Sequence, residues 1–176
     1  LDRSLEYATH AVPESSTKYE DQIWLGVIYA KVNNPKRPAV DRFRQATVLA
    51  PKEMGAWLAL VQYLAANPDT KNEAVKTFER AKDEVKKADR ALFVALGQIQ
   101  LGETAKALDE FQPERRAPPN DVRIMLAEAD YLLQLGRLAD ARATFNVVLT
   151  LASASKEEKS SARQRLAIAM AADPNY

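Results

Sequence analysis

The feature that most restricts the fold of this chain is a motif that recurs about every 34 residues. Four of the five phenylalanines follow an alanine by four positions, with steps of 35, 33 and 34 residues, at Ala39-Phe43, Ala74-Phe78, Ala107-Phe111 and Ala141-Phe145. A fixed period of this length is typical of stacked helix pairs, in which each unit buries its apolar face against the next unit. The sequence therefore predicts an all-α, helical-hairpin solenoid.

A second recurring feature has the same spacing. The triplet Gln-Leu-Gly occurs at residues 100–102 and again at residues 134–136, each time where the first helix of a pair should end. Glycine is favoured just after a helix because the residue there often adopts a left-handed backbone conformation. Since two unrelated features share one period, the period itself is well supported.

Each period divides into two helical segments. In the first unit, helices are expected over about residues 22–31 and 38–50, and the second of these carries Ala39, Phe43 and Ala46 on one face. The later units repeat this plan, with each phenylalanine expected to fill the space towards the next unit. Prolines at 113, 118 and 119 should end one helix near Gln112, and a last helix is expected over residues 156–172.

Composition excludes several classes of site. The chain has no cysteine, so it has no disulfide and no thiolate ligand or nucleophile. The formal net charge of +1 gives no overall attraction to nucleic acid or anionic lipid. No apolar segment approaches the roughly 20 residues that cross a bilayer. None of these observations indicates a cellular compartment.

The period also sets the expected domain organisation. We expect one repeat array over residues 1–176, with a half-unit at 1–18, units at about 19–53, 54–87, 88–121 and 122–155, and a terminal helix at 156–172. The first residue is leucine and falls in the middle of a unit. The chain is therefore expected to be a piece of a longer protein.

These repeats resemble the tetratricopeptide repeat family over nearly the whole chain. The family pattern is Trp-x2-Leu-Gly-x2-Tyr, then Ala-x3-Phe, then Pro. The first unit matches it at Leu25, Gly26, Tyr29, Ala39, Phe43, Ala46 and Pro51. No unit matches the pattern completely, but all four keep the same phase.

The resemblance implies a right-handed superhelix whose first helices line a concave groove for peptides or helices. Carried onto this chain, the groove residues would be Ile23, Val27, Leu58, Gln62, Leu92, Leu96, Leu126 and Asp130. Family members that grip acidic chaperone tails use lysine, arginine and asparagine at such places. Here the side chains are mostly aliphatic, which argues against that kind of adaptor.

The resulting hypothesis is a non-enzymatic scaffold that binds an apolar peptide or an amphipathic helix of a protein partner. Two other readings of the groove leucines stay open: they pack between units, or they are covered by other parts of a longer protein. Two other functions also stay open. One is a regulatory or substrate-presenting arm of a larger enzyme, and the other is self-association into homodimers through the ends of the array.

No residue pattern predicts catalysis, a metal or a cofactor. His10 is the only histidine, and the acidic pairs at 83–84, 109–110 and 157–158 are sequence neighbours. On a helix, neighbouring side chains point about 100° apart and do not converge on one substrate. The basic segment 36–44 could contact phosphate. However, Trp24 and Trp57 are expected to be partly buried and to offer no stacking surface, so nucleic acid is not the favoured partner.

Overall fold

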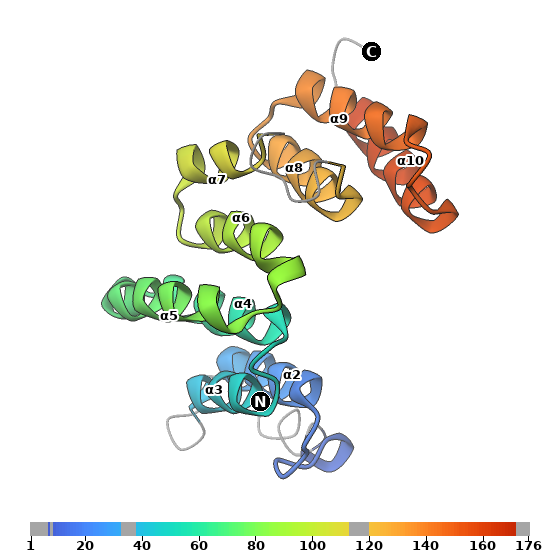
Figure 1. Cartoon of the computed structure of the whole chain (residues 1–176). Helices are drawn as coiled ribbons and strands as arrows, with labels where there is room; N and C mark the ends of the chain where they lie inside the picture. Colours follow the sequence, from blue (N-terminus) through green and yellow to red (C-terminus); the bar gives the residue numbers. More distant parts are fainter. Residues whose placement is uncertain (1–6, 8, 33–37, 113–119, 172–176) are drawn as a thin grey trace. The chain divides into compact units, whose positions relative to one another are not determined.

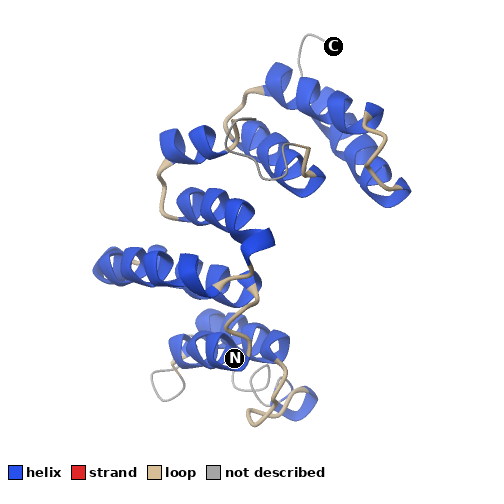
Figure 2. Ribbon diagram, viewed as in Figure 1, coloured by secondary structure: helices blue, strands red, loops and turns tan. Residues whose placement is uncertain are grey.

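The structure, a computed structural model, describes Tyr7 and residues 9–32, 38–112 and 120–171. Every regular element in this part of the chain is a helix, and it contains no strand (Figures 1 and 2). The predicted all-α class is therefore confirmed. The chain forms two compact units, Leu1–Glu103 and Thr104–Tyr176. The predicted array boundaries themselves stay a prediction.

After a short helical segment that ends at Ala11, the described part of the first unit contains two complete helix pairs and one further α-helix. Its helices are α2 (Tyr19–Val32), α3 (Ala39–Leu49), α4 (Met54–Ala65), α5 (Lys71–Glu84) and α6 (Arg90–Gln100). Helix α2 packs on α3, and α4 packs on α5, while α2 contacts α4 and α4 contacts α6 (Figure 1). The first helices of successive pairs, α2, α4 and α6, thus form one row.

The second unit has the same construction. It contains α7 (Thr104–Glu110), α8 (Val122–Gln134), α9 (Leu138–Thr150) and α10 (Lys156–Ala171). Helix α8 packs on α9, and α10 packs on both (Figure 1). Helix α7 ends two residues before Gln112, where the proline-rich segment predicted a stop. Residues 113–119, which follow, lie outside the described residues, as do residues 1–6 and 8 of the predicted half-unit at 1–18.

Both predicted glycine stops have the expected backbone. Gly102 and Gly136 have φ angles of 77° and 71°. At the first, the Gly102 N–H donates to the Ile99 carbonyl over 3.0 Å and the Glu103 N–H donates to the Gln98 carbonyl over 2.8 Å. This paired bonding satisfies carbonyls that the end of a helix leaves free. The recurring triplet is therefore a helix-stop signal.

The recurring phenylalanines join successive helix pairs, as predicted. The ring of Phe43 on α3 lies 5.1 Å from the ring of Tyr63 on α4, and Phe111 lies 6.4 Å from Tyr131 on α8. Both distances fall in the range of about 4.5–7 Å at which aromatic rings attract each other beyond their area burial. Gly97 lies 34 positions after Tyr63 and 34 positions before Tyr131, so a glycine stands where the other two units have a tyrosine.

At Gly97 the ring of Phe78 takes the place of a side chain. A β-carbon at Gly97 would lie 2.3 Å from Cε2 of Phe78, which is closer than real contacts allow. The centre of the Phe78 ring lies 5.5 Å from the centre of the Phe93 ring, and both side chains are buried. The glycine is thus required by the close approach of a ring. The motif alone did not reveal this contact.

A buried polar side chain fastens the N-terminal segment onto the first unit. Gln22 is fully buried, and its Nε2 donates to the carbonyls of Glu14 (3.0 Å) and Ser16 (2.8 Å). Arg42 Nη1 also donates to the Glu14 carbonyl over 3.1 Å, and the Tyr29 hydroxyl donates to the Glu14 carboxylate over 2.6 Å. Because burying an amide without partners is unfavourable, these bonds fix the segment's position.

Helix α8 begins at an aspartate cap. The Asp121 carboxylate accepts from the Arg123 N–H over 2.9 Å and from the Arg123 guanidinium over 2.8 Å. Burial on its own would raise the pKa of Asp121, but these hydrogen bonds and the Arg123 charge outweigh it, so the pKa is lowered overall. The ionised carboxylate is therefore the form that stabilises the folded chain.

Replacing Asp121 with alanine should lower the free energy of unfolding by about 1 kcal/mol at neutral pH, because the cap is lost. The folded pKa lies below the ordinary value of 3.8. The stabilisation is therefore complete above that ordinary value and is lost as the pH falls through the folded pKa. Urea unfolding should show the difference between wild type and Asp121→Ala shrinking in acid. Asp121→Asn, which keeps an acceptor oxygen, should retain most of the cap; a loss equal to that of alanine would contradict this account.

Candidate functional site

The row of first helices in the first unit carries six of the predicted groove residues. Val27 on α2 is 41% exposed, and Gln62 on α4 is also exposed. Ile23, Leu58 and Leu96 are partly buried, and the first two pack against the unit's hydrophobic core. Leu92 is 5% exposed and belongs to the interior. The row therefore offers a mixed surface of exposed and half-buried apolar side chains.

The exposure of Trp24 was not predicted from the sequence. Trp24 is 42% exposed, more than expected, and it lies three positions before Val27 on the same side of α2. Trp57, by contrast, is buried, and its indole N–H donates to the Pro51 carbonyl over 2.8 Å. The two tryptophans have different environments because they stand at different positions of the repeat. The step of 35 residues from Phe43 to Phe78 relates Trp57 to the buried Gln22 and not to Trp24.

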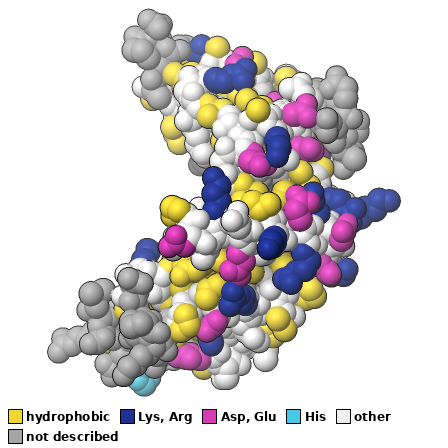
Figure 3. Space-filling model, turned by 90° about the vertical axis from the view of Figure 1, so that its left-hand side faces the viewer, with side chains coloured by type: hydrophobic (Ala, Val, Ile, Leu, Met, Phe, Trp, Pro, Cys, Tyr) yellow, Lys and Arg dark blue, Asp and Glu magenta, His cyan; other side chains and the backbone are white. Residues whose placement is uncertain are grey.

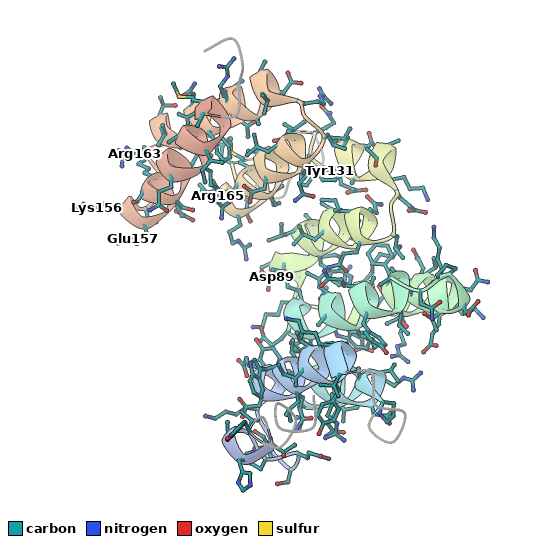
Figure 4. All side chains as sticks on the ribbon, turned by 180° about the vertical axis from the view of Figure 1, so that it is seen from behind. Asp89, Tyr131, Lys156, Glu157, Arg163 and Arg165 are labelled. Carbon is teal, nitrogen blue, oxygen red and sulfur yellow. The ribbon has the colours of Figure 1, made fainter. Side chains whose placement is uncertain are left out.

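The second unit carries the other two predicted groove residues, both on α8. Leu126 is partly buried and packs against that unit's hydrophobic cluster. The Asp130 carboxylate accepts from Arg165 Nη1 of α10 over 2.6 Å, and Arg165 lies on the side of α10 that faces α8 (Figure 4). Burial raises the pKa of Asp130, and the charge of Arg165 offsets only part of that rise. Asp130 is thus engaged within its own unit.

Catalytic and metal-binding arrangements are not found in the part of the chain that the structure describes. His10 is exposed. Glu158 of one acidic pair caps the start of α10: its N–H donates to the Ser155 hydroxyl oxygen over 3.1 Å, and its carboxylate accepts from the Ser155 N–H over 2.8 Å. Among the described residues no group of three or more histidine, aspartate or glutamate side chains could hold a metal ion. No described helix is long and apolar enough to cross a membrane.

The described part of the predicted basic segment 36–44 does not form one basic surface. Lys36 and Arg37 lie outside the described residues. Arg42 turns towards the N-terminal segment, where it bonds the Glu14 carbonyl and also donates to Gln22 Oε1 over 3.3 Å. Only Arg44 is exposed, and it pairs with Glu73 over 2.7 Å. This segment accordingly gives no support to a nucleic-acid site.

Comparison with known proteins agrees with the repeat pattern. A family model described as tetratricopeptide repeat matches residues 1–154, which is most of the chain. A search of curated proteins found no match. The match covers the first compact unit, the second unit as far as residue 154, and the four phenylalanine motifs. It confirms the helical-hairpin solenoid that the sequence predicted. The chain therefore belongs to the tetratricopeptide repeat family, whose repeats generally mediate protein–protein interactions and are typically not enzymes.

Proposed function

We propose that the row formed by α2, α4 and α6 binds an apolar peptide or the apolar face of an amphipathic helix from a protein partner. The observation that carries the proposal is the pair of exposed apolar side chains on α2, Trp24 and Val27, which are 42% and 41% exposed. Tryptophan is enriched among the residues that dominate binding energy at protein interfaces. An exposed tryptophan beside an exposed valine is therefore a suitable anchor point.

The neighbouring helices extend this apolar surface. Leu58 on α4 and Leu96 on α6 are partly buried, so each keeps some surface that a partner can cover. Leu92 is almost fully buried and belongs to the interior beneath this surface. Three parallel helices that carry apolar side chains suit a partner whose own apolar residues recur every three or four positions. Leu126 and Asp130 on α8 are the corresponding candidate residues of the second unit.

The two tryptophans allow binding to be observed directly. The chain has only Trp24 and Trp57, so Trp57→Phe leaves Trp24 as the sole tryptophan. An amphipathic helical peptide with leucine at positions i, i+3, i+4 and i+7 is a suitable probe. Its binding should shift the Trp24 emission to shorter wavelength, because the indole would lose contact with water. A matched peptide with the leucines replaced by serine should leave the emission unchanged.

Replacing Val27 with aspartate should weaken peptide binding by about tenfold or more, because a charge would enter a contact that excludes water. Val75→Asp is the matched control: Val75 lies on α5, outside the row, and is 39% exposed, close to the 41% of Val27. Fluorescence titration of both variants gives the two affinities. Equal binding by the two variants, or a loss at Val75 alone, would contradict the proposed surface.

The same single-tryptophan variant distinguishes partner binding from self-association. Light scattering over a dilution series reports whether the chain forms dimers without peptide. If the Trp24 emission shifts with protein concentration alone, a second copy of the chain occupies the row and the proposal of a heterologous partner is wrong.

A further inference from the structure

The first unit also has a hollow between α3 and α5, the second helices of two successive pairs. It has a volume of about 510 Å³ and is lined by side chains from α3, α4 and α5. This volume falls within the roughly 300–1,000 Å³ of typical ligand clefts. Figure 3 shows basic, acidic and apolar side chains interspersed on one face of the molecule. None of the eight lining residues is a predicted groove residue, although one of them, Leu60, lies on α4.

Three cations and one carboxylate line this hollow. The cations are Arg44, Lys76 and Arg80, and the carboxylate is Glu73, which pairs with Arg44 over 2.7 Å. Neither Lys76 nor Arg80 forms an ion pair with any residue that the structure describes. These two cations lie four positions apart on α5, a spacing at which like charges repel. An anion bound between them would relieve that repulsion.

The guanidinium of Arg80 is held in place. It lies 5.0 Å from the centre of the Trp57 ring, a contact that attracts a cation to the aromatic face. Trp57 is buried and fixed by its bond to the Pro51 carbonyl. Because the guanidinium is already positioned, less conformational freedom is lost when it binds a carboxylate.

Apolar side chains accompany the charges. Val48, which lines the hollow, is 71% exposed, and Leu60 of α4 also contributes to the lining. A ligand that combines carboxylates with an aliphatic group would match both features. A polypeptide supplies this combination, whereas single-stranded nucleic acid binds chiefly through base stacking on aromatic side chains. No aromatic residue is among the described residues that line the hollow.

We propose that this hollow is a second binding site, which takes an acidic, leucine-containing segment of a protein partner. The carboxylates would contact Lys76 and Arg80, and an aliphatic side chain would cover Val48. This inference does not depend on the proposed function of the α2, α4 and α6 row, since the two surfaces share no residue.

The test is fluorescence anisotropy with a fluorescein-labelled peptide of alternating glutamate and leucine, in low salt. The double variant Lys76→Glu/Arg80→Glu should bind the peptide about tenfold more weakly or worse, because two attractions become repulsions. Lys71→Glu is the control: it reverses one charge on the same helix, as Lys76→Glu alone does, but Lys71 does not line the hollow. Its affinity should stay within about twofold of wild type.

Further variants keep the result interpretable. Replacing Arg80 removes its contact with Trp57 and could disturb the fold for that reason alone. The exposed Lys76 makes no such contact, so the single variant Lys76→Glu is titrated as well. It should give a smaller loss in the same direction. Leu96→Asp, on the other face, should not change binding of the acidic peptide. If it abolished binding, the peptide would occupy the row and the second site would be wrong.

Three other outcomes would overturn the proposal. The first is no binding by the wild-type chain. The second is an equal loss in Lys71→Glu and in the double variant, which would indicate general charge attraction. The third is a single-stranded oligonucleotide that displaces the peptide and binds more tightly than it does. A peptide in which glutamine replaces glutamate should fail to bind; binding unchanged by that replacement would also be contradictory.

Discussion

Replacing Phe78 with alanine is expected to lower the free energy of unfolding of the first compact unit by about 3–5 kcal/mol. Phe78 is 3% exposed, and its ring fills the space above Gly97 and lies 5.5 Å from the Phe93 ring. Alanine would leave a cavity between α5 and α6, because glycine on the facing helix offers no side chain that can move into it. The loss should therefore fall in the upper part of the range for buried aromatic residues.

Urea unfolding followed by circular dichroism measures this loss. Val75→Ala, on the same helix but 39% exposed, is the control and should change the free energy of unfolding by no more than about 0.5 kcal/mol. A loss at Phe78 as small as the loss at Val75 would mean that the recurring phenylalanines do not carry the stacking of successive helix pairs.

Replacing Gly97 with leucine is expected to destabilise the first unit by about 2–3 kcal/mol, for the opposite reason. Even the β-carbon would lie 2.3 Å from the Phe78 ring, so the ring or the helix must move. Leucine forms helices better than glycine does, by about 0.8–1.0 kcal/mol, but this gain is smaller than the strain of overpacking.

Gly55→Leu provides a matched control, again measured by urea unfolding. Gly55 also lies in a helix, and nothing is within 4 Å of its β-carbon position. The same substitution there should be neutral or stabilising. Combining Gly97→Leu with Phe78→Ala should destabilise by less than the two single losses added together, because each change relieves the other. Fully additive losses would show that the two positions do not share one packing site.

The local signals in the sequence predicted the helices closely. The expected terminal helix at 156–172 corresponds to α10 (Lys156–Ala171), and the segment at 38–50 corresponds to α3 (Ala39–Leu49). These boundaries follow from nearby features such as proline, glycine and the apolar face. The first helix begins earlier than expected, at Tyr19, because the Gln22 network fastens the preceding segment to it.

The details of packing between helix pairs could not be predicted in this way. Gly97 stands 34 positions from Tyr63 and from Tyr131, and the pattern alone does not show that a ring replaces the missing tyrosine. Similarly, Asp130 was chosen by its place in the repeat, whereas its partner Arg165 lies 35 positions away on a helix outside the phenylalanine pattern. Such contacts depend on how two helices approach each other.

The candidate surfaces also combine features that the sequence pattern predicted with contacts that form only in the folded chain. The resemblance to the family selected Val27, Leu58 and Leu96 on α2, α4 and α6. Trp24 was expected to be more buried than the structure shows. The basic hollow was not foreseen, because Arg44 of α3 meets residues 73–80 of α5 only in the folded chain.

The central claim is that a partner lies along the row of α2, α4 and α6, and nuclear magnetic resonance of methyl groups tests it most directly. With isoleucine, leucine and valine methyls labelled, the amphipathic peptide should shift the signals of Val27, Leu58 and Leu96. The signals of Val48 and Val75, which are 71% and 39% exposed on the second helices, should stay in place. Shifts confined to Val48 and Val75, or no shift at saturating peptide, would contradict the account.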